Sequence, residues 1–155
     1  MAATAGMCAV TGRSVAPDIL AHLTPTTTAV ATAITVTGPM KLALMVAAVT
    51  NTDAATAHEC LDANYARVAV PAWNAVATTG GAGYGVGFAK RTNNGAMTFF
   101  GGTGCAVAQT ITGDMLVSSD ATPVEVFYEN FAAGVSVPIN NQYVVANAAC
   151  AVSIG

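Results

Sequence analysis

The chain has 155 residues, enough for one domain with a sizeable core but not for two comfortable ones. Apolar residues make up 54% and charged residues 8%, and the five basic residues are scattered, so we expect no nucleic-acid binding, which needs a basic stripe. The most apolar window, residues 29–49, is interrupted by Gly38-Pro39 and carries Lys41, so we expect no membrane span. Other copies or partner proteins are expected to cover the apolar exterior.

Residues 1–28 are rich in Ala and Thr and lack hydrophobic periodicity, which predicts an extended N-terminal arm. Within the arm, residues 17–23 could form two turns of helix, because Pro17 suits a first helical position and Asp18 a first turn. The arm is expected to dock on a neighbouring subunit. No signal peptide is visible, so we expect the chain to be made in a reducing cytoplasm.

Residues 29–155 are predicted to form a β domain of short strands separated by turn residues. The pattern predicts a strand at residues 29–37 and a second strand directly after Gly38-Pro39. Further strands are predicted at residues 65–70, 84–89, 97–100, 105–112, 115–118, 124–131, 135–139 and 143–154, the last one broken near Asn147. Asn93-Asn94-Gly95 predicts a hairpin turn, and Gly113-Asp114, Gly134 and Asn140-Asn141 predict further turns. Such spacing is typical of an antiparallel β-sandwich, here jelly-roll-like, rather than of βαβ units.

The sequence offers few groups for catalysis, and we expect no enzyme. Cys105 with His22 or His58 could form a nucleophile and base, but no local signature supports this pairing. Carboxylate pairs could come from Glu125 with Glu129, or from Asp114 with Asp120. A small hydrolase on a β-scaffold therefore stays an alternative.

We expect neither a metal nor another cofactor. His58-Glu59-Cys60 brings three possible ligands together, but consecutive residues of an extended chain diverge. The glycine-rich residues 80–87 match no phosphate-binding motif. Cys8, Cys60, Cys105 and Cys150 are too far apart for a zinc pattern and are expected to be buried thiols.

Four residues around the predicted strand at 65–70 are the candidates for a structural or interface role: Glu59, Tyr65, Arg67 and Trp73. Tyr65 with Trp73 could form a platform for carbohydrate. The preferred alternative is that Arg67 stacks on an aromatic ring and pairs with Glu59 or Asp62, and so fixes the loop at residues 51–64.

In the order of its segments the chain resembles a family of small bacteriophage structural proteins, the capsid cement (decoration) proteins, which also include tail-fibre-associated members. The resemblance rests on a helix-like segment (19–23), the proline-led strand GPMKLALMVAAV, an acidic loop with Glu59 before Tyr65-Ala66-Arg67 and Trp73, and C-terminal strands from MTFF to VVANAACAVSIG. It implies a jelly-roll-like sandwich, often trimeric, that binds between major capsid proteins on the virion surface. The alternative within the same family is a tail-fibre or receptor-binding module that contacts host glycan.

Overall fold

The computed structural model describes residues 4–7, 28–31, 34–37, 39–50, 57–75, 89–121 and 125–154. Within these ranges the chain is all-β, every pair of strands is antiparallel, and no helix occurs. The strands are β1 (Thr4–Met7), β2 (Thr28–Ala31), β3 (Ile34–Thr37), β4 (Lys41–Met45), β5 (Val68–Ala69), β6 (Ala89–Thr92), β7 (Met97–Phe99), β8 (Gln109–Val117), β9 (Glu125–Val137), β10 (Tyr143–Val145) and β11 (Ala151–Ile154).

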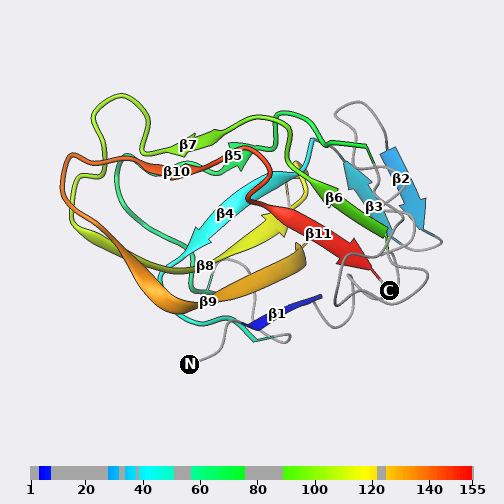
Figure 1. Ribbon diagram of the computed structural model, residues 1–155, viewed down its shortest axis with the longest axis horizontal. Coiled ribbons are helices and arrows are strands. Elements are labelled where there is room, and N and C mark those ends of the chain that lie inside the picture. The colour runs from blue at the N-terminus through cyan, green and yellow to red at the C-terminus, as the bar shows by residue number, and fades with distance from the viewer. Residues whose placement is uncertain are drawn as a thin grey trace.

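A five-stranded sheet in the order β1-β9-β8-β4-β5 forms the centre of the molecule (Figure 1). Three two-stranded pairs accompany it: β10 with β7, β11 with β6, and β2 with β3. Strand β1 lies at one edge, where Thr4 pairs with Asn130 of β9. The helix predicted for residues 17–23 lies outside the described residues.

The longest strands, β8 and β9, run through positions that the sequence analysis assigned to turns. Gly113-Asp114 lies inside β8, not at a turn, and Gly134 lies inside β9. Gly113 is needed for close approach instead, because a Cβ atom there would stand 2.3 Å from the carbonyl oxygen of Glu129. The expected break survives only as a register shift between Ile111 and Gly113, so those turn predictions are wrong.

The hairpin predicted at Asn93-Asn94-Gly95 is also wrong, because its flanking strands do not pair with each other. Strand β6 pairs with β11, and β7 pairs with β10. Asn93 is buried, and its side-chain amide donates to the carbonyl oxygens of Gly95 (2.7 Å) and Ala146 (2.9 Å) while its side-chain oxygen accepts from the Cys150 amide. The turn therefore joins two strand pairs through buried side-chain hydrogen bonds.

Other predicted strands form with altered limits. The predicted strand at residues 29–37 is two strands, β2 and β3, that pair with each other. Of the predicted strand at 65–70, only β5 forms. The predicted break near Asn147 is present, since a turn at residues 147–149 separates β10 from β11.

Two apolar clusters lie on opposite faces of the five-stranded sheet, because successive side chains of a strand point to opposite faces. On one face, Leu42, Leu44 and Leu116 pack with residues of β7, β10 and β11, including Met97, Phe99, Val145 and Val152. The other face carries Ala43, Met45, Val49, Met115 and Val117. The pairs β7–β10 and β6–β11 therefore cover the first face, which holds the larger cluster.

Candidate functional site

Residues 58–60 run beside the end of β4 and bring Glu59 to the sheet. Glu59 forms an isolated antiparallel bridge with Met45. On either side of the bridge, the Val46 amide donates to the His58 carbonyl oxygen and the Cys60 amide donates to that of Leu44, both at 2.9 Å. This short pairing holds the Glu59 side chain in a buried position.

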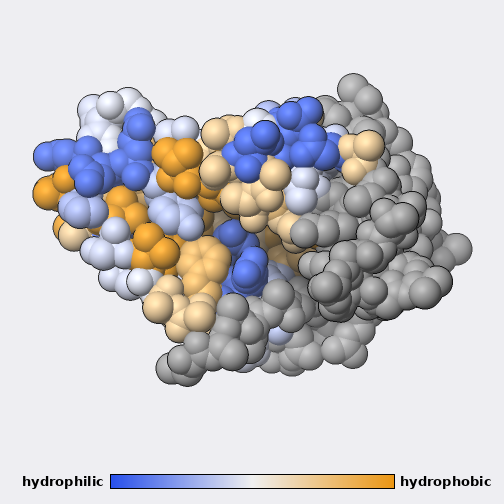
Figure 2. Space-filling view, in the orientation of Figure 1, coloured by the Kyte–Doolittle hydropathy of each residue, from blue (hydrophilic) through white to orange (hydrophobic). Residues whose placement is uncertain are grey.

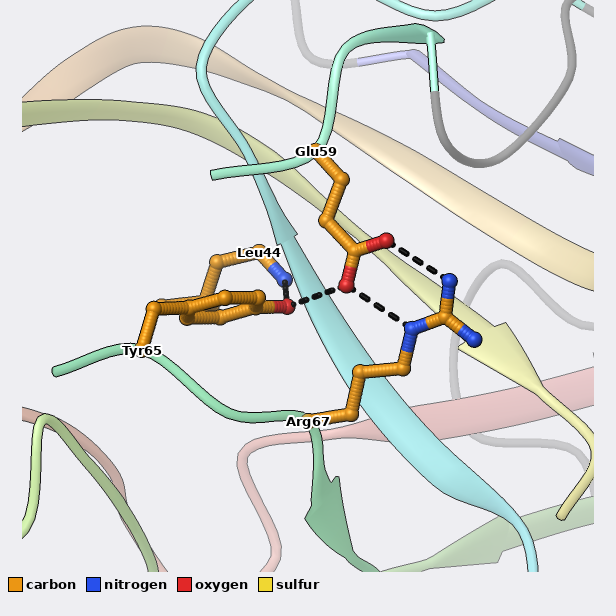
Figure 3. Close-up of polar contacts among 4 residues, drawn as sticks. All are labelled: Leu44, Glu59, Tyr65 and Arg67. Carbon is orange, nitrogen blue, oxygen red and sulfur yellow. Dashed lines mark hydrogen bonds and ion pairs between the residues drawn. The ribbon is translucent and has the colours of Figure 1, made fainter. Parts of the chain in front are cut away.

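Glu59, Tyr65 and Arg67 form a hydrogen-bonded cluster, shown in Figure 3. Arg67 makes a two-point contact, with Nε 2.8 Å from Glu59 Oε1 and a terminal nitrogen 2.7 Å from Oε2. The Tyr65 hydroxyl donates to Glu59 Oε1 at 2.8 Å and accepts from the Leu44 amide at 3.0 Å. Both carboxylate oxygens of Glu59, the Tyr65 hydroxyl and two of the three guanidinium nitrogens of Arg67 thus find partners within the cluster, as buried polar groups require.

The electrostatics of the cluster favour its charged pair and a neutral tyrosine. The hydrogen bonds to Glu59 raise the pKa of the Arg67 guanidinium, although burial acts in the opposite direction. Burial, and then the hydrogen bond to Glu59, raise the pKa of the Tyr65 hydroxyl. The raised pKa of Arg67 is that of a cation in an ion pair that fixes the chain.

Tyr65 and Trp73, the residues of the predicted carbohydrate platform, both pack against the larger apolar cluster. The Tyr65 ring lies 6.3 Å from the Phe99 ring, nearly parallel to it, and 6.1 Å from the Phe100 ring. Trp73 packs on the same apolar cluster and forms an isolated bridge with Asn93. Both aromatic side chains therefore contribute to packing.

Asp62, which the sequence analysis considered only as a partner for Arg67, binds backbone amides instead. Its carboxylate accepts from the amides of Asn64 (2.8 Å), Ala106 (3.1 Å) and Val107 (2.9 Å). Burial alone would raise the pKa of Asp62, but these backbone hydrogen bonds together lower it. The Asp62-Ala63-Asn64 spacing, typical of an Asx turn, is a sequence signal that could have revealed this role.

The loop that Asp62 binds is held to the end of β9 by further backbone contacts. The Cys105 amide donates to the Asn141 carbonyl oxygen, and the Asn140 amide donates to that of Cys105, both at 2.9 Å. Gly104 has a φ of +77°, and a Cβ atom there would lie 2.1 Å from the Asn140 carbonyl carbon. Only glycine fits this position.

These contacts build an end of the molecule that we call the apolar end, defined by Leu61, Val107, Val135 and Ile139. The four side chains are 91%, 61%, 41% and 55% exposed. Residues beside them in the chain are joined, since Asp62 binds the Val107 amide and Gln109, at the start of β8, pairs with Val137, which lies between Val135 and Ile139. The lobe at the left of Figure 2 carries strongly hydrophobic atoms interspersed with hydrophilic ones.

The predicted catalytic groups do not assemble in the predicted pairs. The Cys105 thiol is buried and donates to the Pro138 carbonyl oxygen at 2.9 Å, and no described histidine contacts it. In the β8–β9 register Asp114 lies opposite Glu129. An acid of one predicted carboxylate pair therefore faces an acid of the other pair. The error follows from the supposed turn at Gly113-Asp114, since a continuous β8 carries Asp114 past β9.

Among the residues that the structure describes, no group of three or more His, Cys, Asp and Glu side chains could hold a metal ion. Cys60, Cys105 and Cys150 are free thiols, while Cys8 and the glycine-rich residues 80–87 lie outside the described residues. The described ranges also contain no helix long and apolar enough to cross a bilayer.

Comparisons with protein-family models, with curated proteins and with solved structures found no match. Function is therefore inferred from the contacts and the chemistry of this chain's own residues.

Proposed function

We propose that this chain is a structural virion protein of the capsid cement type, which binds between major capsid subunits on the surface of a phage head. It acts by binding alone, as a homotrimer assembled in the bacterial cytoplasm. A protein that binds only the assembled lattice stabilises that lattice by mass action. A jelly-roll-like β-sandwich is part of the same proposal, supported by the strand pairs that pack on one face of the five-stranded sheet.

The observation that carries the proposal is the apolar end. Residues 92–113 and 130–155 contain no Asp, Glu, Lys or Arg, so Val107, Val135 and Ile139 lie in uncharged segments. The nearby Asp62 is buried against backbone amides. An exposed apolar surface without charge is typical of the core of a protein interface.

The apolar end is also held in shape before any partner binds. Asp62 fixes residues 106–107, and the Asn64 side chain donates to the Gly104 carbonyl oxygen at 2.8 Å. A preordered surface loses less conformational entropy on binding, so more of its contact energy appears as affinity. This supports a binding role better than a catalytic one.

Counting copies in purified virions tests the proposal against its alternatives. A cement protein should be present in hundreds of copies per particle and should be released when the capsid is mildly dissociated, whereas a tail-fibre module should be present in tens. A small hydrolase would instead lose an activity when His58 or Cys105 is replaced by alanine. Absence from capsids, or a copy number in the tens, would refute the cement role.

A pair of variants locates the contact surface. Leu61→Asp with Val107→Asp places two charges on the apolar end and should weaken binding to depleted capsids by about tenfold or more, the scale of lost interface anchors. Val46→Asp is the matched control, since Val46 is 37% exposed and lies just beyond β4. Equal binding by the double variant and the control would show that the apolar end is not the contact.

A further inference from the structure

A row of residues crosses the centre of the five-stranded sheet and includes two acidic side chains. Asp114 of β8 pairs with Leu44 of β4 on one side and with Glu129 of β9 on the other. Directly opposed residues of antiparallel strands share a face, with Cβ atoms about 4.5–5.5 Å apart. Leu44 belongs to the larger apolar cluster, so both acids lie on the face covered by β7–β10 and β6–β11.

The described ionisable groups that face Asp114 are Glu129, Tyr143 of β10 and Cys150, which lies just before β11. Burial raises the pKa of Tyr143 and raises that of Cys150 to about 12, and in both cases Asp114 and Glu129 add to the rise. Tyr143 and Cys150 pack on the same apolar cluster as Leu44, so the half-buried Asp114 and the exposed Glu129 lie on the face that the C-terminal segment covers. Figure 2 shows hydrophilic atoms recessed between apolar ones over β8 and β9.

The side-chain carboxyl group of Asp114 receives no hydrogen bond from any described residue. No described cation offsets its charge, and its nearest acidic neighbour is the like-charged Glu129. Burial first, and then Glu129, raise the pKa of Asp114 to about 7. Below about pH 7 the Asp114 carboxyl group is therefore mostly protonated.

We infer that Asp114 is a proton-binding site that controls how tightly the C-terminal strands β10 and β11 pack on the sheet. When Asp114 holds its proton, the acid is neutral and Tyr143 and Cys150 close over it. When the proton is lost to solvent, the half-buried Asp114 and the exposed Glu129 become opposed like charges on neighbouring strands, and this segment loosens. The inference does not depend on the proposed virion role.

The sign of the effect follows from linkage. The folded protein holds the Asp114 proton up to about pH 7, whereas the unfolded chain releases it near the ordinary value of 3.8. Stability from this group is therefore complete below the unfolded pKa and is lost as the pH rises through the folded pKa. The unfolding equilibrium constant should rise by up to about tenfold per pH unit between pH 4 and 7, with little further change above.

Urea unfolding of the full chain and of Asp114→Asn, each from pH 5 to 8, measures this effect. The wild type should lose stability from pH 5 to about pH 7, and the difference between the two proteins should fall over that range and level off above it. Asp120→Asn is the matched control, with the same chemical change in the bend after β8, and should keep the wild-type profile. Parallel profiles for wild type and Asp114→Asn would overturn the inference.

Two measurements on the unaltered protein keep the inference testable if Asp114→Asn fails to fold. The side-chain carboxyl carbon of Asp114, followed by NMR, should titrate near pH 7, and a midpoint near 4 would overturn the proposal. Amide hydrogen exchange, corrected for its intrinsic pH dependence, should lose protection at Tyr143–Val145 and Ala151–Ile154 more than at β4 between pH 5.5 and 8. A uniform loss across the sheet would show that the C-terminal strands do not respond selectively.

Discussion

Glu59 and Asp114 belong to segments that pair with opposite sides of strand β4, and their carboxyl groups have different surroundings. The segment of Glu59 pairs with β4 from one side, and Asp114 of β8 pairs with Leu44 from the other. Glu59 accepts hydrogen bonds from the Tyr65 hydroxyl and from two nitrogens of Arg67. Asp114 has no described donor and faces Glu129.

The comparison shows that burial alone does not decide the charge of an acid. Hydrogen bonds and a countercharge stabilise the ionised form, whereas desolvation and a like charge stabilise the protonated form. Tyr65 and Arg67 supply the hydrogen bonds and the countercharge at Glu59, and this site fixes a loop. At Asp114 only desolvation and the like charge of Glu129 act, and we infer that this site is sensitive to pH.

The largest effect is expected when the Glu59 site is made to resemble the Asp114 site. Arg67→Met keeps the length of the side chain but leaves Glu59, a buried acid, without its countercharge. Breaking one partner of a buried ion pair costs about 3–5 kcal/mol of the free energy of unfolding. Urea unfolding at pH 7 measures this cost.

Lys41→Met provides the control for Arg67→Met, because Lys41 has no ion pair among the described residues and should change stability by about 0.5 kcal/mol or less. The double variant Arg67→Met with Glu59→Gln should recover part of the loss, since no charge then remains buried. A cost below about 1 kcal/mol for Arg67→Met would place the pair among solvated surface bridges.

A smaller effect is expected when only one donor is taken from Glu59. Tyr65→Phe keeps the ring against Phe99 but removes the hydroxyl that donates to Glu59 and accepts from the Leu44 amide. Leaving buried polar groups without a partner costs about 1–3 kcal/mol.

Thermal or urea unfolding measures the cost of Tyr65→Phe. Tyr128→Phe is its control, because the Tyr128 hydroxyl makes no hydrogen bond within the described residues. If the two phenylalanine variants lose stability equally, the Tyr65 hydroxyl contributes nothing specific to the cluster.

The two acids also differ in how far the sequence could reveal them. Glu59, Tyr65 and Arg67 lie within nine residues of the sequence. The pairing of Arg67 with Glu59 was one of the two pairings predicted for Arg67. Local spacing is informative there because the donors and the acceptor lie on one short loop. Arg67 pairs with Glu59 and not with Asp62, because Asp62 binds the amides of residues 106–107. These residues are distant in sequence, so local spacing could not predict which of the two acids Arg67 would bind.

Asp114 could not be placed beside Glu129 without knowing the strand register. Gly113-Asp114 has the composition of a turn, and the reason that Gly113 lies inside β8 is the backbone of β9 against it. The all-β, antiparallel class followed from alternation and strand spacing. The partners of β6 and β7 did not, since the Asn93 turn joins two strand pairs and local turn chemistry cannot distinguish this from a hairpin.

The smallest effect is expected when the like charge is removed from the Asp114 site. Glu129→Gln leaves Asp114 buried but removes the second contribution to its raised pKa, so the titration midpoint of Asp114 should fall. Opposed like charges on neighbouring strands cost from a few tenths of a kcal/mol to about 1 kcal/mol. The variant should therefore be more stable than wild type by that amount at pH 8.

At pH 5, where Asp114 holds its proton in both proteins, Glu129→Gln and the wild type should be nearly equal in stability. Urea unfolding at the two pH values measures the contrast, and Glu125→Gln, at the start of β9, is the control with the same change of group. An equal gain in the free energy of unfolding at both pH values would mean that the effect of Glu129 does not depend on the charge of Asp114. Because burial is the larger cause of the raised pKa, the wild-type loss of stability with pH should persist in Glu129→Gln in reduced form.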